Sequence, residues 1–119
     1  MIRAVGVDLI EVGRIRSLIA RQPRFLARCF TPAEQAELAG RADPAPGFAA
    51  RFAAKEAFQK VWPESISWLD VWVAKNGRAP VLGFAPHLAE AMAAQHLVAH
   101  VSLSHAKTHA VATVVLQQR

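Results

Sequence analysis

An acidic residue that follows an apolar strand is the first candidate for chemistry. Residues 6–12 (GVDLIEV) place Asp8 at the end of a run that alternates around Val5 and Val7 and is typical of a buried strand. A carboxylate fixed there could hold a metal ion rigidly, or it could only cap the helix that follows. Position alone leaves both interpretations open.

A second group of charges lies on the strongest helix pattern of the chain. Residues 51–60 (RFAAKEAFQK) put Glu56 and Lys60 four residues apart on one face, with Arg51 and Lys55 four apart on a neighbouring face. A carboxylate surrounded by cations suits a magnesium diphosphate, because Mg²⁺ takes one or two carboxylates and leaves its other positions to water and phosphate oxygens. A solvated helix face with one weak ion pair is the alternative.

Histidine and serine alternate in a third segment, residues 100–105 (HVSLSH). In a strand, His100 and His105 point to opposite faces, which makes them a poor pair of zinc ligands. No acid is placed to orient either histidine for a serine nucleophile, and no Gly-rich phosphate loop is present. His105, beside a turn at the end of this strand, remains the histidine of interest.

Composition limits the classes of protein that these segments can belong to. The 119 residues suffice for one domain, residues 1–119, and 53% of them are apolar against 19% charged, which excludes a disordered chain. The formal net charge of +5 favours a polyanion or an acidic protein as partner. The apolar excess in so small a chain also suggests an oligomer interface.

The sequence also indicates a cytoplasmic location. The single cysteine, Cys29, can form neither an internal disulfide nor a thiolate cluster, which favours a reducing compartment. The first residues lack a signal-peptide pattern. The longest stretch without Asp, Glu, Lys or Arg, residues 91–106, is too polar to cross a membrane.

Hydrophobic periodicity and turn residues predict an α+β fold, a small mostly antiparallel sheet with helices packed against it. Thr31 to Glu34 begins a helix with a capping box, and Asn76-Gly77 is a hairpin turn. We expect residues 40–47 (GRADPAPG) to form a mobile loop. The expected strands are residues 2–8, 68–75, 80–84, 99–104 and 109–116, and the expected helices are residues 11–21, 31–40, 48–61 and 86–96.

Together, the three segments resemble the bacterial holo-acyl-carrier-protein synthases, the short class of 4′-phosphopantetheinyl transferases. The resemblance covers nearly the whole chain, and the Lys-Glu-Ala core of the second segment is its most specific part. The matching stretches are GVDLIEVGRI (6–15), RFAAKEAFQK (51–60) and HVSLSHAKTHAVATVV (100–115), with TPAE (31–34) and NGRAPVL (76–82) between them.

The resemblance implies a reaction and its metal ion. The 4′-phosphopantetheine arm of coenzyme A would pass to a serine of apo-acyl carrier protein, with release of adenosine 3′,5′-bisphosphate, in fatty acid biosynthesis. The family requires Mg²⁺, and its metal carboxylates match Asp8 and Glu56. Asp8, Glu56 and Lys60 are therefore the expected catalytic residues. The general base stays open between Glu56 and a metal-held water, with Lys60 suitable only if its pKa were lowered.

The resemblance also implies how coenzyme A is bound. Arg51 and His105 match phosphate-binding positions, Lys60 matches a phosphate-side or acid-base position, and Lys55 lies beside the motif's glutamate. The expected coenzyme A ligands are thus Arg51, Lys55, Lys60 and His105.

A docking helix for the acidic carrier protein follows from the same resemblance. Arg14, Leu18 and Arg21 form a stripe at spacing i, i+4, i+7, and Arg24 and Phe25 extend it. An exposed Leu18 between two arginines suits a binding stripe, although an ordinary basic face is the alternative. The short class further implies a homotrimer with active sites between neighbouring subunits.

The chain departs from the family after Lys60, where residues 61–67 (VWPESIS) replace the usual Gly-rich loop, so the contacts to pantetheine are open. In residues 40–47, Arg41 is the only cation left to meet the nucleotide.

Two other functions compete with an enzyme. A nucleic-acid-binding domain would spread cations along one face with aromatic platforms, whereas here the cations cluster on two helices. A basic carrier-protein-binding module without catalysis would have lost one of the two acids, and both Asp8 and Glu56 are present. We therefore expect an enzyme that binds neither nucleic acid nor membranes.

Overall fold

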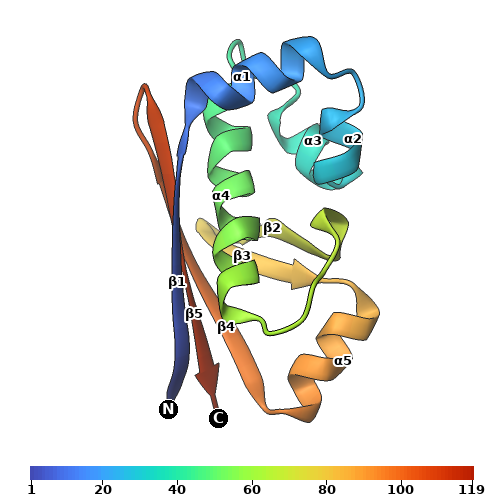
Figure 1. Cartoon of the computed structure of the whole chain (residues 1–119), viewed down its shortest axis with the longest axis vertical. Coiled ribbons are helices and arrows are strands. Elements are labelled where there is room, and N and C mark those ends of the chain that lie inside the picture. Colours follow the sequence, from blue (N-terminus) through green and yellow to red (C-terminus); the bar gives the residue numbers. More distant parts are fainter.

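The computed structural model describes residues 1–119 and has the predicted α+β fold, with helix α4 running along one face of a three-stranded sheet (Figure 1). The strands are β1 (Ile2–Glu11), β2 (Val71–Asn76), β3 (Ala79–Phe84), β4 (Leu97–His105) and β5 (His109–Gln118). The helices are α1 (Val12–Arg21), α2 (Phe25–Cys29), α3 (Pro32–Leu38), α4 (Ala45–Val61) and α5 (Pro86–Ala94), with one 3₁₀ turn, η1 (Trp68–Asp70). No helix combines the length and the apolar character needed to cross a membrane.

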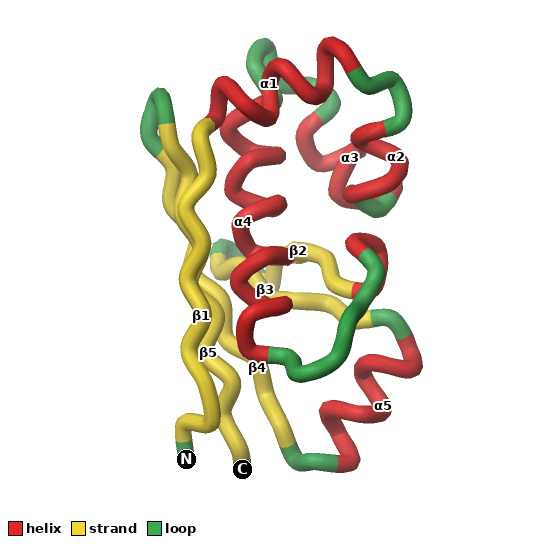
Figure 2. Tube along the Cα trace, viewed as in Figure 1, coloured by secondary structure: helices red, strands yellow, loops and turns green.

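The strands form two antiparallel sheets rather than the single sheet that the sequence suggested. The larger sheet has the order β1-β5-β4, and the β2-β3 hairpin forms a separate sheet in which β3 lies beside β4 (Figure 2). The predicted hairpin turn is confirmed, with Gly77 at a positive φ of 67° that a side chain would disfavour. Periodicity identified these strands but could not say which of them pair.

Three predicted boundaries are wrong. Strand β1 continues to Glu11, so Asp8 lies within the strand rather than at its end, and Glu11 instead of Asp8 takes the N-cap position of α1. Helix α4 begins at Ala45, so the last three residues of the predicted loop are helical. Pro46 is tolerated there because the first N–H groups of a helix have no partner within it. Residues 68–70 form the turn η1 instead of the start of a strand, because Ser67 and Asp70 build a capping box around it.

One face of the larger sheet is covered by α4, and its other face is bare (Figure 1). On β1, Val5, Val7 and Leu9 point to the bare face and are 62%, 53% and 65% exposed. The prediction of a buried strand therefore holds only for the inward side, where Gly6 and Ile10 are buried.

A close contact between β1 and α4 sets the distance between these two elements. A side chain at Gly6 would overlap the backbone carbonyl of Ala57 and crowd Val61. Ala53 and Ala57, the small residues on this side of α4, are fully buried, as the helix pattern predicts. The absence of a side chain at Gly6 thus lets the strand lie directly against the helix backbone.

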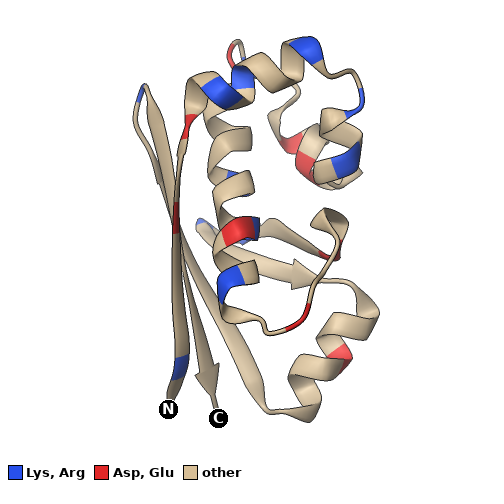
Figure 3. Ribbon diagram, in the orientation of Figure 1, with Lys and Arg blue, Asp and Glu red and all other residues tan.

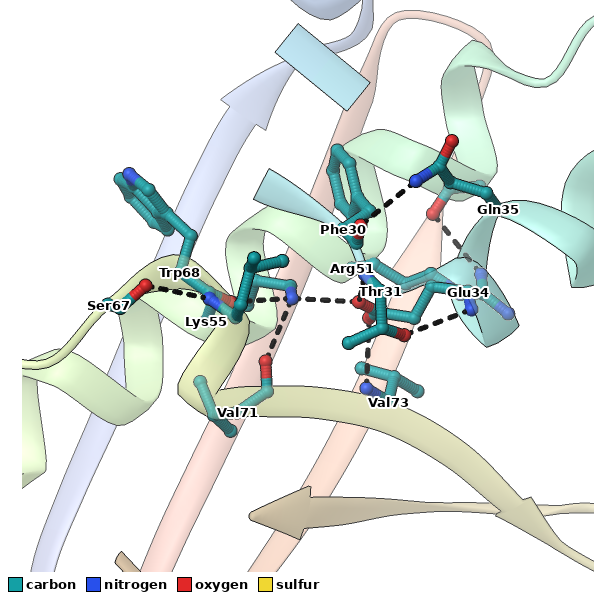
Figure 4. Close-up of polar contacts among 12 residues, drawn as sticks. Phe30, Thr31, Glu34, Gln35, Arg51, Lys55, Ser67, Trp68, Val71 and Val73 are labelled. Carbon is teal, nitrogen blue, oxygen red and sulfur yellow. Dashed lines mark hydrogen bonds and ion pairs between the residues drawn. The ribbon is translucent and has the colours of Figure 1, made fainter. Parts of the chain in front are cut away.

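A buried ion pair links three parts of the chain (Figure 4). Lys55 of α4 and Glu34 of α3 are each 1% exposed, with 2.8 Å between Lys55 Nζ and Glu34 Oε1. Glu34 also accepts from the backbone N–H of Thr31, completing the predicted capping box, and from that of Val73 in β2. Burial lowers the pKa of the Lys55 ammonium, and the Glu34 carboxylate partly offsets this. Both charges are therefore satisfied by partners rather than by water.

Replacing Lys55 with methionine is expected to lower the free energy of unfolding by about 3–5 kcal/mol, because the Glu34 carboxylate is left buried without its counter-charge. The double variant Lys55→Met/Glu34→Gln should lose less, since no unpaired charge remains. Chemical denaturation measures both values. Lys75→Met breaks the exposed pair of Lys75 with Glu37 (3.2 Å) and should cost under about 1 kcal/mol. Equal losses in Lys55→Met and Lys75→Met would contradict this account.

Candidate active site

Asp8 lies on the inward side of β1, two residues beyond the Gly6 contact, and so faces α4. Lys60 of α4 donates from Nζ to the Val7 carbonyl at 2.7 Å and lies 3.4 Å from Asp8 Oδ1. Figure 3 shows acidic positions on both β1 and α4. The structure therefore brings together the acid of the first motif and the lysine of the second.

Glu56 lies one helical turn before Lys60 and shares this environment. Burial raises the pKa of the Glu56 carboxyl, and the negative charge of Asp8 raises it further. The ammonium of Lys60 and the guanidinium of Arg14 partly offset the shift. Repulsion between two carboxylates is the electrostatic signature of a site that a cation would relieve.

The side chains at this point suit Mg²⁺, which takes some of its ligands from water or phosphate, better than a metal ion that takes all of its ligands from the protein. The structure has no group of three or more His, Cys, Asp or Glu side chains that could hold a metal ion. Two carboxylates such as Asp8 and Glu56 are the usual protein contribution to Mg²⁺ that also binds phosphate. Arg14, predicted only as a docking residue, belongs to the electrostatics of this site as well.

Arg51 and His105 meet in a basic pocket of about 210 Å³ between α4, β4 and the hairpin. Arg41, Lys75 and Arg78 also line this pocket, and no acidic side chain does. Sequence reasoning missed Lys75 and Arg78. Their positions on either side of the Asn76-Gly77 turn could have predicted that they lie close together, because the residues that flank a tight turn are neighbours in space.

The guanidinium of Arg51 is only partly satisfied. It is 6% exposed and donates from Nη1 to the Gly47 carbonyl at 3.2 Å, while its buried Nε has no partner. Burial lowers the pKa of Arg51, Glu34 opposes this, and Arg41 lowers it further. A buried donor among several cations favours binding of an anion.

Lys55 points away from both of these groups. Its ammonium donates to Glu34 Oε1, to the Trp68 carbonyl at 2.9 Å and to the Val71 carbonyl at 2.8 Å (Figure 4). An ammonium has three donors, so none is left for a phosphate. The predicted contact between Lys55 and coenzyme A thus finds no support in this geometry.

A narrow slot of about 170 Å³ lies between α4 and the segment that follows it. Glu56 borders this slot, so the slot opens directly beside the paired carboxylates. Its α4 side is polar and its other side is mostly apolar; the lining comprises Lys55, Glu56, Gln59, Ile66, Ser67, Trp68 and Val71. The sequence indicated only that this region departs from the family pattern.

The predicted docking stripe lies along α1 and α2, where basic positions concentrate (Figure 3). Arg14, Arg21 and Arg24 are exposed, whereas Leu18 and Phe25 are half-buried and pack against the core. The expectation of an exposed Leu18 is therefore wrong, because the neighbouring helices cover part of its side chain. Beside the stripe is a hollow of about 280 Å³, lined by Gln22, Arg24, Phe25, Arg28, Cys29 and Trp68. Sequence reasoning did not include Arg28 or Trp68, which only the fold brings there.

Comparison with known proteins identifies the family. A family model described as the 4′-phosphopantetheinyl transferase superfamily matches residues 4–114. The holo-[acyl-carrier-protein] synthase of Thermus thermophilus is 51% identical over 120 residues, covering 100% of this chain and 96% of that protein. The Deinococcus deserti protein of the same name is 48% identical over 127 residues, covering all of both chains.

Solved structures agree with the sequence relatives. The Neisseria meningitidis holo-[acyl-carrier-protein] synthase matches with a TM-score of 0.88 at 28% identity, covering 99% of this chain and 100% of that one. The Bacillus anthracis synthase, solved in complex with CoA (3′,5′-ADP), matches with a TM-score of 0.82 at 32% identity, covering 100% and 99%. The chain therefore belongs to the 4′-phosphopantetheinyl transferase superfamily and, within it, to the holo-[acyl-carrier-protein] synthase enzymes.

Proposed function

We propose that this enzyme transfers 4′-phosphopantetheine from coenzyme A to a serine of apo-acyl carrier protein and releases adenosine 3′,5′-bisphosphate. The observation that carries the proposal is the arrangement of three sites along α4. The carboxylates of Asp8 and Glu56 lie at β1, the basic pocket lies around Arg51, and the slot opens beside Glu56. These sites match the diphosphate, the phosphorylated nucleotide and the pantetheine arm of coenzyme A. The relatives solved with coenzyme A or its 3′,5′-ADP part support this match.

Asp8 and Glu56 would hold Mg²⁺ together with the diphosphate of coenzyme A. The bound Mg²⁺ would supply positive charge that stabilises the negative charge developing on the diphosphate. Lys60 holds Asp8 and the Val7 carbonyl in place on the α4 side of the site and adds a positive charge there.

In the proposed reaction, the serine oxygen of the carrier protein attacks the phosphorus that bears the pantetheine arm. The bond from that phosphorus to the departing adenosine bisphosphate oxygen breaks as the new bond forms. Glu56 is our first choice to take the serine proton. It borders the slot that would hold the arm, and it lies on the α4 side of the proposed metal site.

The basic pocket would take the 3′-phosphate of the nucleotide. Arg51 offers an unpaired buried donor, and His105 lines the same pocket. Arg41 and Arg78 add charge at the rim, so a dianionic phosphate would be neutralised without a metal.

The stripe on α1 and α2 would bind the acidic carrier protein. Exposed arginines would attract it over a distance and raise the association rate, and half-buried Leu18 and Phe25 would offer apolar contacts between them. Arg14 acts on the charge of Glu56, so docking along α1 would bring the target serine toward the metal carboxylates.

We further propose a homotrimer with its active sites between subunits. The bare sheet face carries Val5, Val7 and Leu9, and contiguous apolar surface of this kind marks an interface. Asp8 points to the opposite face, but β1 is an edge strand of this sheet, so a neighbouring subunit that packs against β1 and reaches its edge would lie close to the site. We place the enzyme in the cytoplasm, where Cys29 stays reduced.

The first test is mass spectrometry of apo-acyl carrier protein after incubation with the enzyme, coenzyme A and Mg²⁺. A mass gain of one phosphopantetheine, absent when EDTA is added, is the expected result. Asp8→Asn and Glu56→Gln should each slow transfer by more than about 100-fold, because each removes charge that binds the metal. Circular dichroism should show both variants folded. Near-normal transfer in either variant would refute the metal assignment.

Reversal of charge on the docking stripe should weaken binding of the carrier protein without affecting binding of coenzyme A. Arg21→Glu is expected to raise the KM for carrier protein about tenfold and to leave the KM for coenzyme A unchanged. Arg14→Glu should do the same and also alter kcat, since Arg14 acts on Glu56. Arg119→Glu, an equal change of charge at the end of the chain, is the control. An unchanged KM in Arg21→Glu would exclude this surface.

The trimer is tested by sedimentation velocity. The wild-type chain should sediment as a trimer, and Val5→Glu should give folded monomers with little transfer activity, because a charge cannot be buried in an apolar interface. Val81→Glu changes an exposed valine of β3, outside the bare face, and should remain trimeric. A monomeric and active wild-type enzyme would contradict the proposal.

A further inference from the structure

Helix α4 directs two pairs of side chains, each spaced by one turn, to two different neighbours. Glu56 and Lys60 face β1, as described above. Lys55 and Gln59 face residues 64–71, which form the opposite side of the slot and are called the slot wall here. Lys55 directly precedes Glu56, and Gln59 directly precedes Lys60. Each residue that holds the slot wall is therefore the immediate neighbour of a residue of the proposed metal site.

Four hydrogen bonds join the slot wall to these two side chains. Lys55 Nζ donates to the carbonyls of Trp68 and Val71. Gln59 donates from Nε2 to the Glu64 carbonyl at 2.9 Å and accepts from the Ile66 N–H at 3.3 Å. The lysine therefore holds the later part of the wall, and the glutamine holds the earlier part.

The end of the slot wall is fixed independently of α4, because Val71 pairs with β3 and the Asp70 carbonyl accepts from a backbone N–H after β3, whereas the earlier part has few other connections. Residues 63–69 form no backbone hydrogen bond with another segment, since the bond from Asp70 to Ser67 lies within the turn η1. Trp68 stacks on Phe52 of α4 at 4.7 Å between ring centroids, which adds one apolar anchor. The position of residues 64–69 relative to α4 thus depends on the polar contacts of Lys55 and Gln59 and on the stacked Trp68.

We propose that Lys55 and Gln59 are positioning residues that hold the slot wall at the spacing needed to receive the pantetheine arm, and that Lys55 binds no phosphate of coenzyme A. This inference rests on the function proposed above. The slot lining supports it, because Ile66, Trp68 and Val71 suit methylene groups, while Ser67 and Gln59 suit amides. A slot formed in advance binds a flexible arm more tightly, because less ordering is required on binding.

The assignment predicts that two ligands respond differently to the same substitution. Coenzyme A has the arm, and adenosine 3′,5′-bisphosphate lacks it while keeping the nucleotide and its phosphates. A residue that shapes the slot affects coenzyme A alone. A residue that binds phosphate affects both ligands, and a residue that matters only for overall stability affects neither while the protein stays folded.

The experiment is calorimetric titration of both ligands, with Mg²⁺, into the full-length enzyme. Gln59→Leu should weaken binding of coenzyme A about fivefold or more, because two hydrogen bonds to the wall are lost, and leave adenosine 3′,5′-bisphosphate within about twofold. In steady-state transfer assays, its KM for coenzyme A should rise while kcat changes little. Lys55→Met, checked for folding by circular dichroism, should show the same ligand-selective loss.

Gln35→Leu is the matched control. Gln35 is also a half-buried helical glutamine that bonds a backbone carbonyl, that of Phe30 at 3.0 Å, but it lies on α3 and does not border the slot. This variant should bind both ligands as the wild type does.

Three results would overturn the proposal. Equal weakening of both ligands in Lys55→Met would make Lys55 a phosphate-binding residue. Unchanged coenzyme A affinity in Gln59→Leu would show that the wall needs no anchor from α4, and this variant decides the question even if Lys55→Met fails to fold. A wild-type enzyme that binds neither ligand and modifies no carrier protein would overturn the proposed function itself, and the positioning role with it.

Discussion

The contact between Gly6 of β1 and the Ala57 carbonyl of α4 is the constraint on which the candidate site depends. It allows a strand and a helix backbone to lie closer than any side chain at position 6 would permit. Asp8 follows two residues later on the same side of the strand, and Glu56 directly precedes Ala57 on the helix. Their carboxylates are therefore held near enough to raise the pKa of Glu56. The close approach is set by packing, and it has an electrostatic consequence because the strand and the helix each carry an acidic residue at that point.

Helix α4 positions the remaining parts of the site because other elements pack against it on most sides, and its side chains reach each of them. Arg51 points to the basic pocket, Lys55 and Gln59 to the slot wall, and Glu56 and Lys60 to β1. The buried pair of Lys55 and Glu34 then fixes α3 and β2 to the same helix. Burial of a charged pair is costly unless every donor and acceptor is satisfied, and here the carboxylate and the ammonium both are. The helix is thus both the core of the fold and the support of the proposed chemistry.

The bare sheet face and the basic stripe on α1 and α2 are two separate surfaces that suit different partners. On the sheet, exposed Val5, Val7 and Leu9 favour another apolar surface. On α1 and α2, exposed arginines beside half-buried Leu18 and Phe25 favour an acidic one. The positive charge noted in the sequence is therefore concentrated at two places, the stripe on α1 and α2 and the basic pocket around Arg51, and the apolar excess lies at a third, the bare sheet face.

The sequence by itself determined most of the helices and strands, the capping box at Thr31, the hairpin turn at Asn76-Gly77 and the residues of the three motifs. These follow from local periodicity, capping and turn chemistry, which act within a few residues. The family resemblance added the expected roles of Asp8, Glu56 and Arg51, and the comparisons confirmed the family. Only the tertiary structure decided that Lys55 is buried against Glu34, that Lys75 and Arg78 join Arg51, and that Val5 and Val7 are exposed. Helical spacing places Lys55 beside Glu56 but cannot say what lies opposite each side chain, because that partner comes from residues far away in the chain.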